Sequence, residues 1–271
     1  MSKKLYIVGN HSYLLLKKFG RVEKDSSILV HQGNTLKSYH QVKLEYFSEC
    51  NSIVAVGGGG VIDYSKYVAS KLNLHLKVIP TILSTDAMFT SVSIIRCPEV
   101  VYICTKVPEE VELDYVLLED VDWRYHVGTG DVLSIITALR CWRKFPTYDE
   151  DVAKEAMLIV DSLKRPDTKV GIERLFKCLK DEVTLCERVG TSQVEEGIEH
   201  DFAYCFEKYT TSRRVLHGEL VAGGIVCAAK VLNMSVKDLD SIKERFCDLG
   251  LMWRPSELKL NLPRFFELML R

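Results

Sequence analysis

Three residues in the second half of the chain are of the types that bind divalent metals. Asp131 lies in HVGTGDVLSII, His200 in GIEHDFAYCF and His217 in RRVLHGELVAGG. A carboxylate and two imidazoles supply three oxygen and nitrogen ligands and leave one coordination position open. A cation with an open position can hold a substrate oxygen and lower its pKa. Taken singly, Asp131 could be a helix cap and each histidine a satisfied polar side chain.

A run of four glycines is the second feature that could do chemistry. Gly57, Gly58, Gly59 and Gly60 follow the apolar segment SIVAV and precede VIDYSKYVA. Glycines let the backbone approach a ligand closely, and a helix starting near Val61 would offer free N–H groups to an anion. The run is neither a Walker A loop nor the usual G-x-G-x-x-G. A tight packing turn is the alternative, but four glycines are costly for that alone. The run predicts phosphate binding and, with the ligand triplet, a metal-dependent enzyme.

Hydroxyl and carboxyl side chains follow another apolar segment, in IPTILSTDA. Thr81, Ser84 and Asp86 would lie at the carboxyl edge of a parallel sheet, where open α/β folds bind ligands. Alternatively, Ser84, Thr85 or Asp86 caps a helix. The residues alone leave both interpretations open.

The elements that must position these residues differ between the two halves of the chain. Short β-rich runs occur at 4–8, 27–31, 53–56, 76–79, 100–104 and 115–118, with helical patterns at 11–19, 37–47 and 61–72. Strand–helix alternation with apolar strands predicts a parallel sheet covered on both faces. Helical periodicity then dominates at 132–145, 151–164, 172–189, 194–209, 216–233 and 236–249. We therefore expect an α/β domain at 1–122, an all-helical domain at 123–271, and a ligand site in the cleft between them.

Bulk composition narrows the class of protein. With 47% hydrophobic and 27% charged residues, the chain has the profile of a soluble globular protein. The net charge of −1 gives no bulk reason to expect nucleic acid or an anionic membrane as partner. No apolar run approaches the roughly 20 residues of a membrane-spanning helix. Nine cysteines without a CxxC pair indicate buried thiols in a reducing, cytoplasmic compartment.

Five segments, in this order, resemble one superfamily. VGGGGVIDYSKYVA resembles the pyrophosphate loop of the iron-containing alcohol dehydrogenases, glycerol dehydrogenase, glycerol-1-phosphate dehydrogenase and dehydroquinate synthase. IPTILSTDAMFTSVSII is similar to a glycerol dehydrogenase segment, and VGTGDVLSIITALR to the segment with the metal-binding aspartate. GIEHDFAYCF and LHGELVAGG look like the two metal-binding histidine segments of glycerol-1-phosphate dehydrogenase.

The resemblance implies a Rossmann-like nucleotide- and phosphate-binding domain followed by a helical metal-binding domain. It implies that Asp131, His200 and His217 bind Zn²⁺ or Fe²⁺, and that Asp86 faces the substrate. Gly58, Gly59 and Asp63 would serve the cofactor loop, while Thr81 and Ser84 would contact NAD or NADP.

Three functions remain open at this stage. The first is an NAD(P)- and metal-dependent dehydrogenase of a small polyol or polyol phosphate. Such an enzyme could also form a homo-oligomer. The second is a metal-dependent lyase, aldolase or cyclase, because the stretch before Gly57 is shorter than in the family. The third is a non-catalytic relative.

Arg213 and Arg214 could hold a substrate phosphate or form a solvated helix end.

Overall fold

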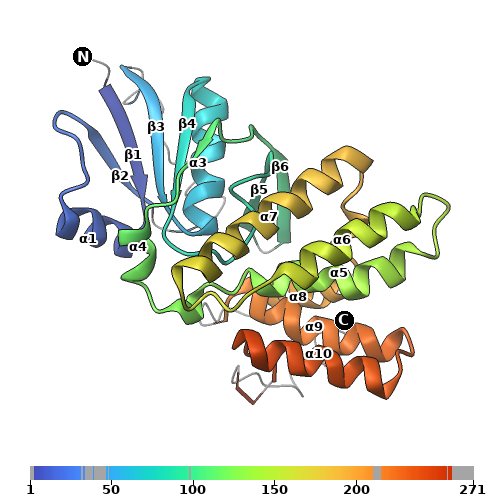
Figure 1. The fold of residues 1–271 in the computed structure, drawn as a ribbon. Helices are drawn as coiled ribbons and strands as arrows, with labels where there is room; N and C mark the ends of the chain where they lie inside the picture. The colour runs from blue at the N-terminus through green and yellow to red at the C-terminus, as the bar shows by residue number, and fades with distance from the viewer. Residues whose placement is uncertain are drawn as a thin grey trace. The chain divides into compact units, whose positions relative to one another are not determined.

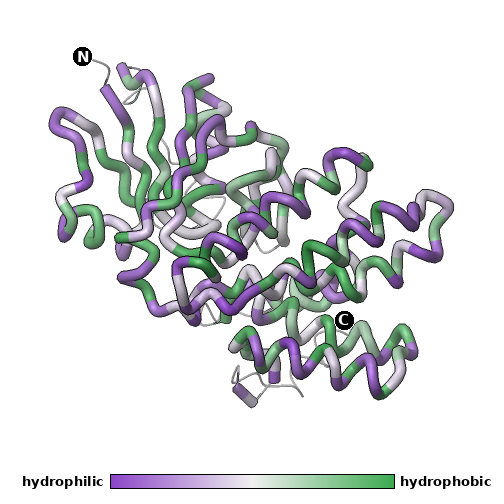
Figure 2. Tube along the Cα trace, in the orientation of Figure 1, coloured by the Kyte–Doolittle hydropathy of each residue, from purple (hydrophilic) through white to green (hydrophobic). Residues whose placement is uncertain are grey.

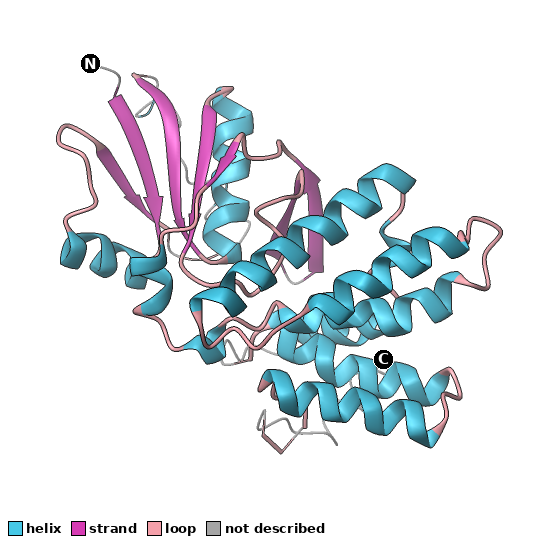
Figure 3. Ribbon diagram, viewed as in Figure 1, coloured by secondary structure: helices cyan, strands magenta, loops and turns pink. Residues whose placement is uncertain are grey.

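The computed structural model describes residues 3–31, 33, 39, 47, 49–97, 99–209, 215–254 and 256–257. The chain divides into two compact units. The first comprises Met1–Ile82 and Asp86–Asp122, and the second comprises Leu83–Thr85 and Trp123–Arg271. Strands belong to the first unit, and the described part of the second is built from helices (Figure 3). Among the described residues, no helix combines the length and apolar character needed to cross a bilayer.

A five-stranded parallel sheet organises the first unit (Figure 1). Its strands are β1 (Lys3–Val8), β2 (Ser27–Val30), β3 (Cys50–Gly57), β4 (His75–Pro80) and β7 (Glu110–Val111), in the order β2-β1-β3-β4-β7. The register pairs Val8 with Val56 and Gly57 with Pro80. The loops that follow β1, β3 and β4 therefore leave the sheet at one carboxyl edge, which is where open α/β sheets bind ligands.

Helices cover both faces of this sheet, as the alternation predicted. Tyr6, Val8, Val54 and Val56 form one buried cluster with residues of α1 (Asn10–Phe19) and with Leu117. Successive strand residues point to opposite faces, so the intervening buried residues face the other side, where α3 (Gly59–Leu72) packs on β1, β3 and β4. The hydropathy colouring shows apolar residues along the sheet strands and alternating colours along α7 and α10 (Figure 2).

Two predicted strands of the first half are wrong in type or placement. Residues 115–118 form a helix, α4 (Tyr115–Glu119), because Asp114 caps it by accepting from the Val116 N–H at 3.0 Å and Leu117 packs into the core. Residues 100–104 do form a strand, β6 (Glu99–Cys104). It pairs antiparallel with the unpredicted β5 (Val92–Cys97) in a separate two-stranded sheet. The predicted helix at 37–47 lies almost wholly outside the described residues.

Lys66 is a fully buried cation in the middle of α3. Its ammonium lies 3.1 Å from Asp63 Oδ1, donates to the Ala87 carbonyl at 2.8 Å, and also contacts the carbonyls of Thr90 and Val92. Burial raises the pKa of Asp63 to about 6, although the nearby Lys66 charge opposes that rise. The hydrogen bonds of Lys66 thus connect α3 to the segment that leads into β5.

The second unit consists of two short 3₁₀ turns and six helices within its described residues. These are η2 (Trp123–Tyr125), α5 (Thr129–Trp142), α6 (Glu150–Ser162), α7 (Lys169–Val189), η3 (Ser192–Val194), α8 (Ile198–Tyr209), α9 (His217–Val231) and α10 (Val236–Leu249). Residues next to the helices define several of their ends. Asp149, Thr168 and Ser235 cap the N-termini of α6, α7 and α10, and Gly190 and Gly250, in the left-handed conformation, end α7 and α10. The predicted fold class, an α/β Rossmann-like part followed by a helical part, is confirmed.

Candidate metal centre

The three predicted ligands converge in the helical unit. Asp131 lies in the first turn of α5, His200 in the first turn of α8, and His217 is the first residue of α9. One potential ligand atom from each residue lies within 4.8 Å of those of the other two. His217 Nε2 is 3.9 Å from Asp131 Oδ1. Asp131 and His200 are buried, and His217 is partly exposed, so a cation here would be largely shielded from water.

Asp131 is not the cap of its helix, which was the structural alternative. Gly128 occupies the cap position of α5, and no side chain caps it. Asp131 stands three residues further on, in the first helical turn, where the helix dipole favours a negative charge. The start of the helix places its carboxylate near His217.

Glycines allow the starts of α5 and α9 to approach closely, so that Asp131 and His217 lie near each other. A Cβ on Gly130, the neighbour of Asp131, would overlap the carbonyl of Gly218, the neighbour of His217. A Cβ on Gly218 would in turn overlap the Val127 carbonyl. A side chain at either position would force the starts of α5 and α9 apart, and with them two of the ligands.

Replacing Gly218 with alanine is expected to weaken metal binding and to lower stability by about 1–3 kcal/mol, the usual cost of an overpacked core. Gly223→Ala is the matched control, because a Cβ on this other glycine of α9 meets only the Trp253 carbonyl at an ordinary 3.5 Å. Metal titration and denaturant unfolding of both variants check the prediction. Equal metal affinity in the two variants would contradict it.

Two buried glutamates that contact the histidines were not predicted from the sequence. Glu199 Oε1 lies 3.2 Å from Nδ1 of His200, and Glu207 Oε1 lies 3.1 Å from Nδ1 of His217. The side chain of Glu199 is fully buried and that of Glu207 is 6% exposed. An acidic residue adjacent to a predicted ligand, as in EH at 199–200, was the one available signal. Nothing in the sequence indicated that Glu207 would reach His217 across the break between α8 and α9.

Tyr204 packs against both histidines of the cluster. Its ring stacks on His217 at 5.5 Å between centroids and lies 5.8 Å from the ring of His200. Its hydroxyl donates to Glu196 at 2.6 Å. The two imidazoles are thus packed against one aromatic ring, which restricts their rotation.

The glycine run forms a strand–turn–helix junction in the α/β unit. Helix α3 begins at Gly59, two residues earlier than expected, and Gly58 is its extended N-cap, with φ −88° and ψ −174°. No side chain caps this helix. Gly57 is buried, Gly58 and Gly59 are half-buried and Gly60 is exposed, so the first turn of the helix is accessible. Thr81 lies beside this junction and donates its N–H to the Gly57 carbonyl at 3.2 Å.

The remaining predicted site residues have different surroundings. Asp63 directs its carboxylate to Lys66. Asp86 is half-buried in the α/β unit, where its carbonyl accepts from the Phe89 N–H in a turn. A turn is present here, as the alternative interpretation expected, but it leads towards β5 and no helix begins at these residues, so none of Ser84, Thr85 and Asp86 is a helix N-cap. Arg213 and Arg214 lie outside the described residues.

Ser84 belongs to the helical unit through a three-residue segment. The Leu83 N–H donates to Nδ1 of His126 at 3.0 Å, and the Leu83 carbonyl accepts from the Gly128 N–H at 2.9 Å. Gly128 caps α5, so this segment is attached to the helix start that carries Asp131. Ser84 itself is buried.

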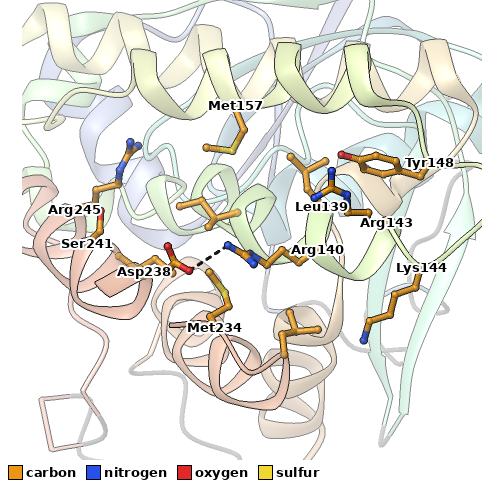
Figure 4. A pocket seen from close by; sticks show the side chains of 13 residues that line it. Leu139, Arg140, Arg143, Lys144, Tyr148, Met157, Met234, Asp238, Ser241 and Arg245 are labelled. Carbon is orange, nitrogen blue, oxygen red and sulfur yellow. Dashed lines mark hydrogen bonds and ion pairs between the residues drawn. The ribbon is translucent and has the colours of Figure 1, made fainter. Parts of the chain in front are cut away.

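A hollow of about 510 Å³ lies among α5, α6 and α10 of the helical unit (Figure 4). Its charged lining residues are Arg140, Arg143, Lys144, Asp238 and Arg245. The three arginines pair with carboxylates of Asp238, Glu150 and Asp161 respectively. None of the predicted metal ligands lines it, so this hollow is separate from the ligand cluster.

Comparisons with known proteins agree with the resemblance seen in the motifs. Residues 15–119 match the model of the iron-containing alcohol dehydrogenase family. The described fold resembles a probable glycerol dehydrogenase from Sinorhizobium meliloti 1021, with a TM-score of 0.79 at 19% identity over 98% of this chain and 81% of that one. It also resembles glycerol dehydrogenase from Schizosaccharomyces pombe, with a TM-score of 0.75 at 18% identity over 96% and 73%. At such identities the likeness concerns the fold.

Relatives found by sequence indicate a narrower group of enzymes than the solved structures do. The chain is 29% identical over 227 residues to glycerol-1-phosphate dehydrogenase [NAD(P)+] of Sulfurisphaera tokodaii, which covers 78% of this chain and 63% of the relative. It is 30% identical over 193 residues to the enzyme of that name from Sulfolobus acidocaldarius, covering 66% and 55%. The chain therefore spans less than two thirds of the length of these relatives. The resemblance inferred from the motifs is confirmed: the chain is related to the iron-containing alcohol dehydrogenase and glycerol dehydrogenase superfamily.

Proposed function

We propose that this protein is a divalent-metal-dependent dehydrogenase that oxidises a small polyol or polyol phosphate and passes hydride to NAD or NADP. The observation that carries the proposal is the convergence of Asp131, His200 and His217 from three helices. Relatives named glycerol-1-phosphate dehydrogenase [NAD(P)+] and structures named glycerol dehydrogenase support this substrate class.

The donor set fits Zn²⁺ or Fe²⁺. One carboxylate and two imidazoles with an open position are typical of catalytic sites for such cations. Each histidine also has one ring nitrogen against a buried carboxylate, the usual arrangement around metal-bound histidines. A bound cation would polarise the substrate hydroxyl and lower its pKa. Asp131 would contribute the one negatively charged ligand, and the histidines would contribute neutral nitrogens.

The α/β part, residues 1–122 in our division, would bind the dinucleotide that accepts the hydride. The accessible first turn of α3 at Gly58, Gly59 and Gly60 would receive the pyrophosphate, since free N–H groups and the helix dipole favour an anion there. From the resemblance, Thr81 and Ser84 would contact the dinucleotide. Asp63 would act indirectly, by holding α3 through Lys66.

Asp86 is proposed for the proton of the substrate hydroxyl. A carboxylate oxygen of Asp86 would accept this proton, directly or through one water. This role comes from the resemblance of IPTILSTDAM to the glycerol dehydrogenase segment. Asp86 is half-buried as a residue, as expected of a group at the edge of a ligand site.

The two rival functions have less support. The relatives and solved structures described above are named as dehydrogenases, so nothing favours a lyase, aldolase or cyclase. A non-catalytic role would leave no reason to hold two histidines and a carboxylate together in a largely buried cluster.

The test is reduction of NAD⁺ or NADP⁺ by metal-loaded protein. Zn²⁺- and Fe²⁺-loaded samples are mixed with each cofactor and a panel of polyols and polyol phosphates, and the absorbance of reduced nicotinamide is followed. We expect metal-dependent reduction with at least one substrate. Absence of reduction with every substrate, together with no calorimetric binding of either cofactor, would contradict the proposal.

Replacing Gly59 with valine is expected to weaken dinucleotide binding about 10- to 100-fold, because hydrogen bonds to a charged phosphate contribute about 1.5–3 kcal/mol. A valine side chain at the first residue of α3 would stand where the phosphate oxygens approach. Lys71→Ala, at the exposed C-terminal end of the same helix, is the control. Calorimetric titration with NADH and NADPH checks the prediction, and equal affinities for wild type and Gly59→Val would show that the phosphate binds elsewhere.

A further inference from the structure

Each histidine of the ligand cluster has one ring nitrogen occupied by a buried glutamate. His200 Nδ1 faces Glu199 Oε1 at 3.2 Å, and His217 Nδ1 faces Glu207 Oε1 at 3.1 Å. Neither glutamate is a member of the three-residue ligand group. The same contact thus occurs twice around one cluster: both glutamates lie on α8, and the histidines lie on α8 and α9.

The surroundings of the two glutamates assign the direction of these hydrogen bonds. Glu199 Oε1 already accepts the Gly197 N–H, so it is assigned as the acceptor from His200 Nδ1–H, and the matching contact of Glu207 with His217 is assigned in the same way. A neutral imidazole has one protonated nitrogen, so Nε2 keeps its lone pair. His217 Nε2 is also the nitrogen that lies 3.9 Å from Asp131 Oδ1. In each ring, Nε2 is therefore the nitrogen that the glutamate does not contact.

Glu199 is itself held in place. Its Oε2 accepts from the Thr137 hydroxyl at 2.8 Å, and its Oε1 accepts from the Gly197 N–H. The side chain is fully buried. A Cβ on Gly224 of α9 would overlap the Glu199 carbonyl, so the backbone at this residue is also closely packed. Such fixed partners are what an orienting residue needs.

We propose that Glu199 and Glu207 are positioning residues that hold His200 and His217 in the Nδ1–H tautomer and present both Nε2 atoms to one divalent cation. The inference rests on the proposed function in one respect, because it takes the cluster as a metal site. It does not depend on the substrate or on the dinucleotide.

Metal affinity of the wild type and of four variants tests the proposal. Glu199→Ala and Glu207→Ala are each expected to lower Zn²⁺ affinity about 10- to 100-fold, the usual effect of losing such a partner. Glu199→Gln and Glu207→Gln should recover part of the loss, because the amide oxygen still accepts from Nδ1–H. Affinities are measured by competition with a chromophoric chelator, and the visible spectrum of the Co²⁺-loaded protein reports changes in ligand geometry.

Glu219→Gln is the matched control. Glu219 is a buried carboxylate two residues after His217 in α9, and it accepts from the Leu216 N–H at 3.0 Å. Its variant should bind Zn²⁺ within about twofold of wild type. If the Glu199 and Glu207 alanine variants, correctly folded by circular dichroism, also bind within twofold, the proposal is overturned.

Wild-type protein labelled with ¹⁵N-histidine decides the case if the alanine variants do not fold. Long-range ¹H–¹⁵N spectra of the Zn²⁺-loaded protein should show Nδ1–H and metal-bound Nε2 for both rings. Nδ1 bound to the metal in either ring would overturn the proposal. Wild type that binds Zn²⁺ through both Nε2 atoms but oxidises no polyol would disprove the proposed function while leaving this inference intact. Wild type that binds no divalent cation would overturn both.

Discussion

Alanine at His200 or His217 is expected to abolish metal binding at the cluster and to lower dehydrogenase activity by about 10³-fold or more. Polarisation of the substrate by a cation contributes several kcal/mol to the transition state, and about 1.4 kcal/mol corresponds to a tenfold rate. Each imidazole is one of the three ligands proposed from the described residues, so its loss should leave two, too few to hold the cation tightly. Asp131→Ala should behave alike, since it removes the one charged ligand.

Elemental analysis and steady-state kinetics on the same preparations check this prediction. His75→Ala is the matched control, because His75 is an exposed histidine of β4 in the other unit. The control should retain metal and activity, and the ligand variants should lose both while keeping the helical circular dichroism of wild type. Full metal occupancy in His200→Ala or His217→Ala would show that the cation binds elsewhere.

Methionine in place of Lys66 is expected to lower the free energy of unfolding by about 3–5 kcal/mol, the usual cost of removing one partner from a buried ion pair. The ammonium is fully buried, so its removal leaves the Asp63 carboxylate without its cation and the Ala87 carbonyl without this donor. The loss should be larger than for an ordinary truncation, because methionine fills most of the volume without supplying charge or hydrogen bonds.

The Lys66→Met effect should depend on pH in a defined direction. Burial already raises the pKa of Asp63 to about 6, above its unfolded value of 3.8. For such a group, stability is greatest below the unfolded pKa and declines as pH rises through the folded pKa, because the folded state must ionise a buried carboxyl. Without Lys66 this penalty grows, so the difference between wild type and variant should be larger at pH 7 than near pH 4.

Urea unfolding at both pH values measures this difference. Lys71→Met is the control, because Lys71 lies on the same helix and is exposed. A change of about 0.5 kcal/mol or less is expected there, as for most surface substitutions. A loss in Lys66→Met no larger than in Lys71→Met would mean that the buried ion pair does not stabilise the unit.

The sequence predicted the parts of the fold that periodicity and ligand chemistry determine. The helices of the second half follow their apolar spacing closely, and α10 begins and ends at the predicted residues. Asp131, His200 and His217 could be selected because a carboxylate and two imidazoles are a common metal-ligand set, and because their three segments resemble those of one superfamily. Their convergence rests on Gly130 and Gly218, whose role appears only when α5 and α9 are packed together.

What sequence could not predict depends on contacts between distant segments. YVLL at 115–118 has the composition of a strand, but the Asp114 cap and the burial of Leu117 make it helical. Glu207 meets His217 across ten residues, a distance in sequence that no helical spacing relates. The buried Lys66 ammonium donates to carbonyls of Ala87, Thr90 and Val92, which lie in an irregular segment and at the start of β5, so no local pattern predicts its burial.

Anomalous X-ray diffraction from crystals of the zinc- or iron-loaded protein tests the central claim most directly. The account predicts one strong anomalous peak in each chain, bonded at about 2.0–2.2 Å to an Asp131 oxygen and to Nε2 of both His200 and His217. A peak ligated by other residues, or the absence of any peak at this cluster in metal-saturated crystals, would contradict it.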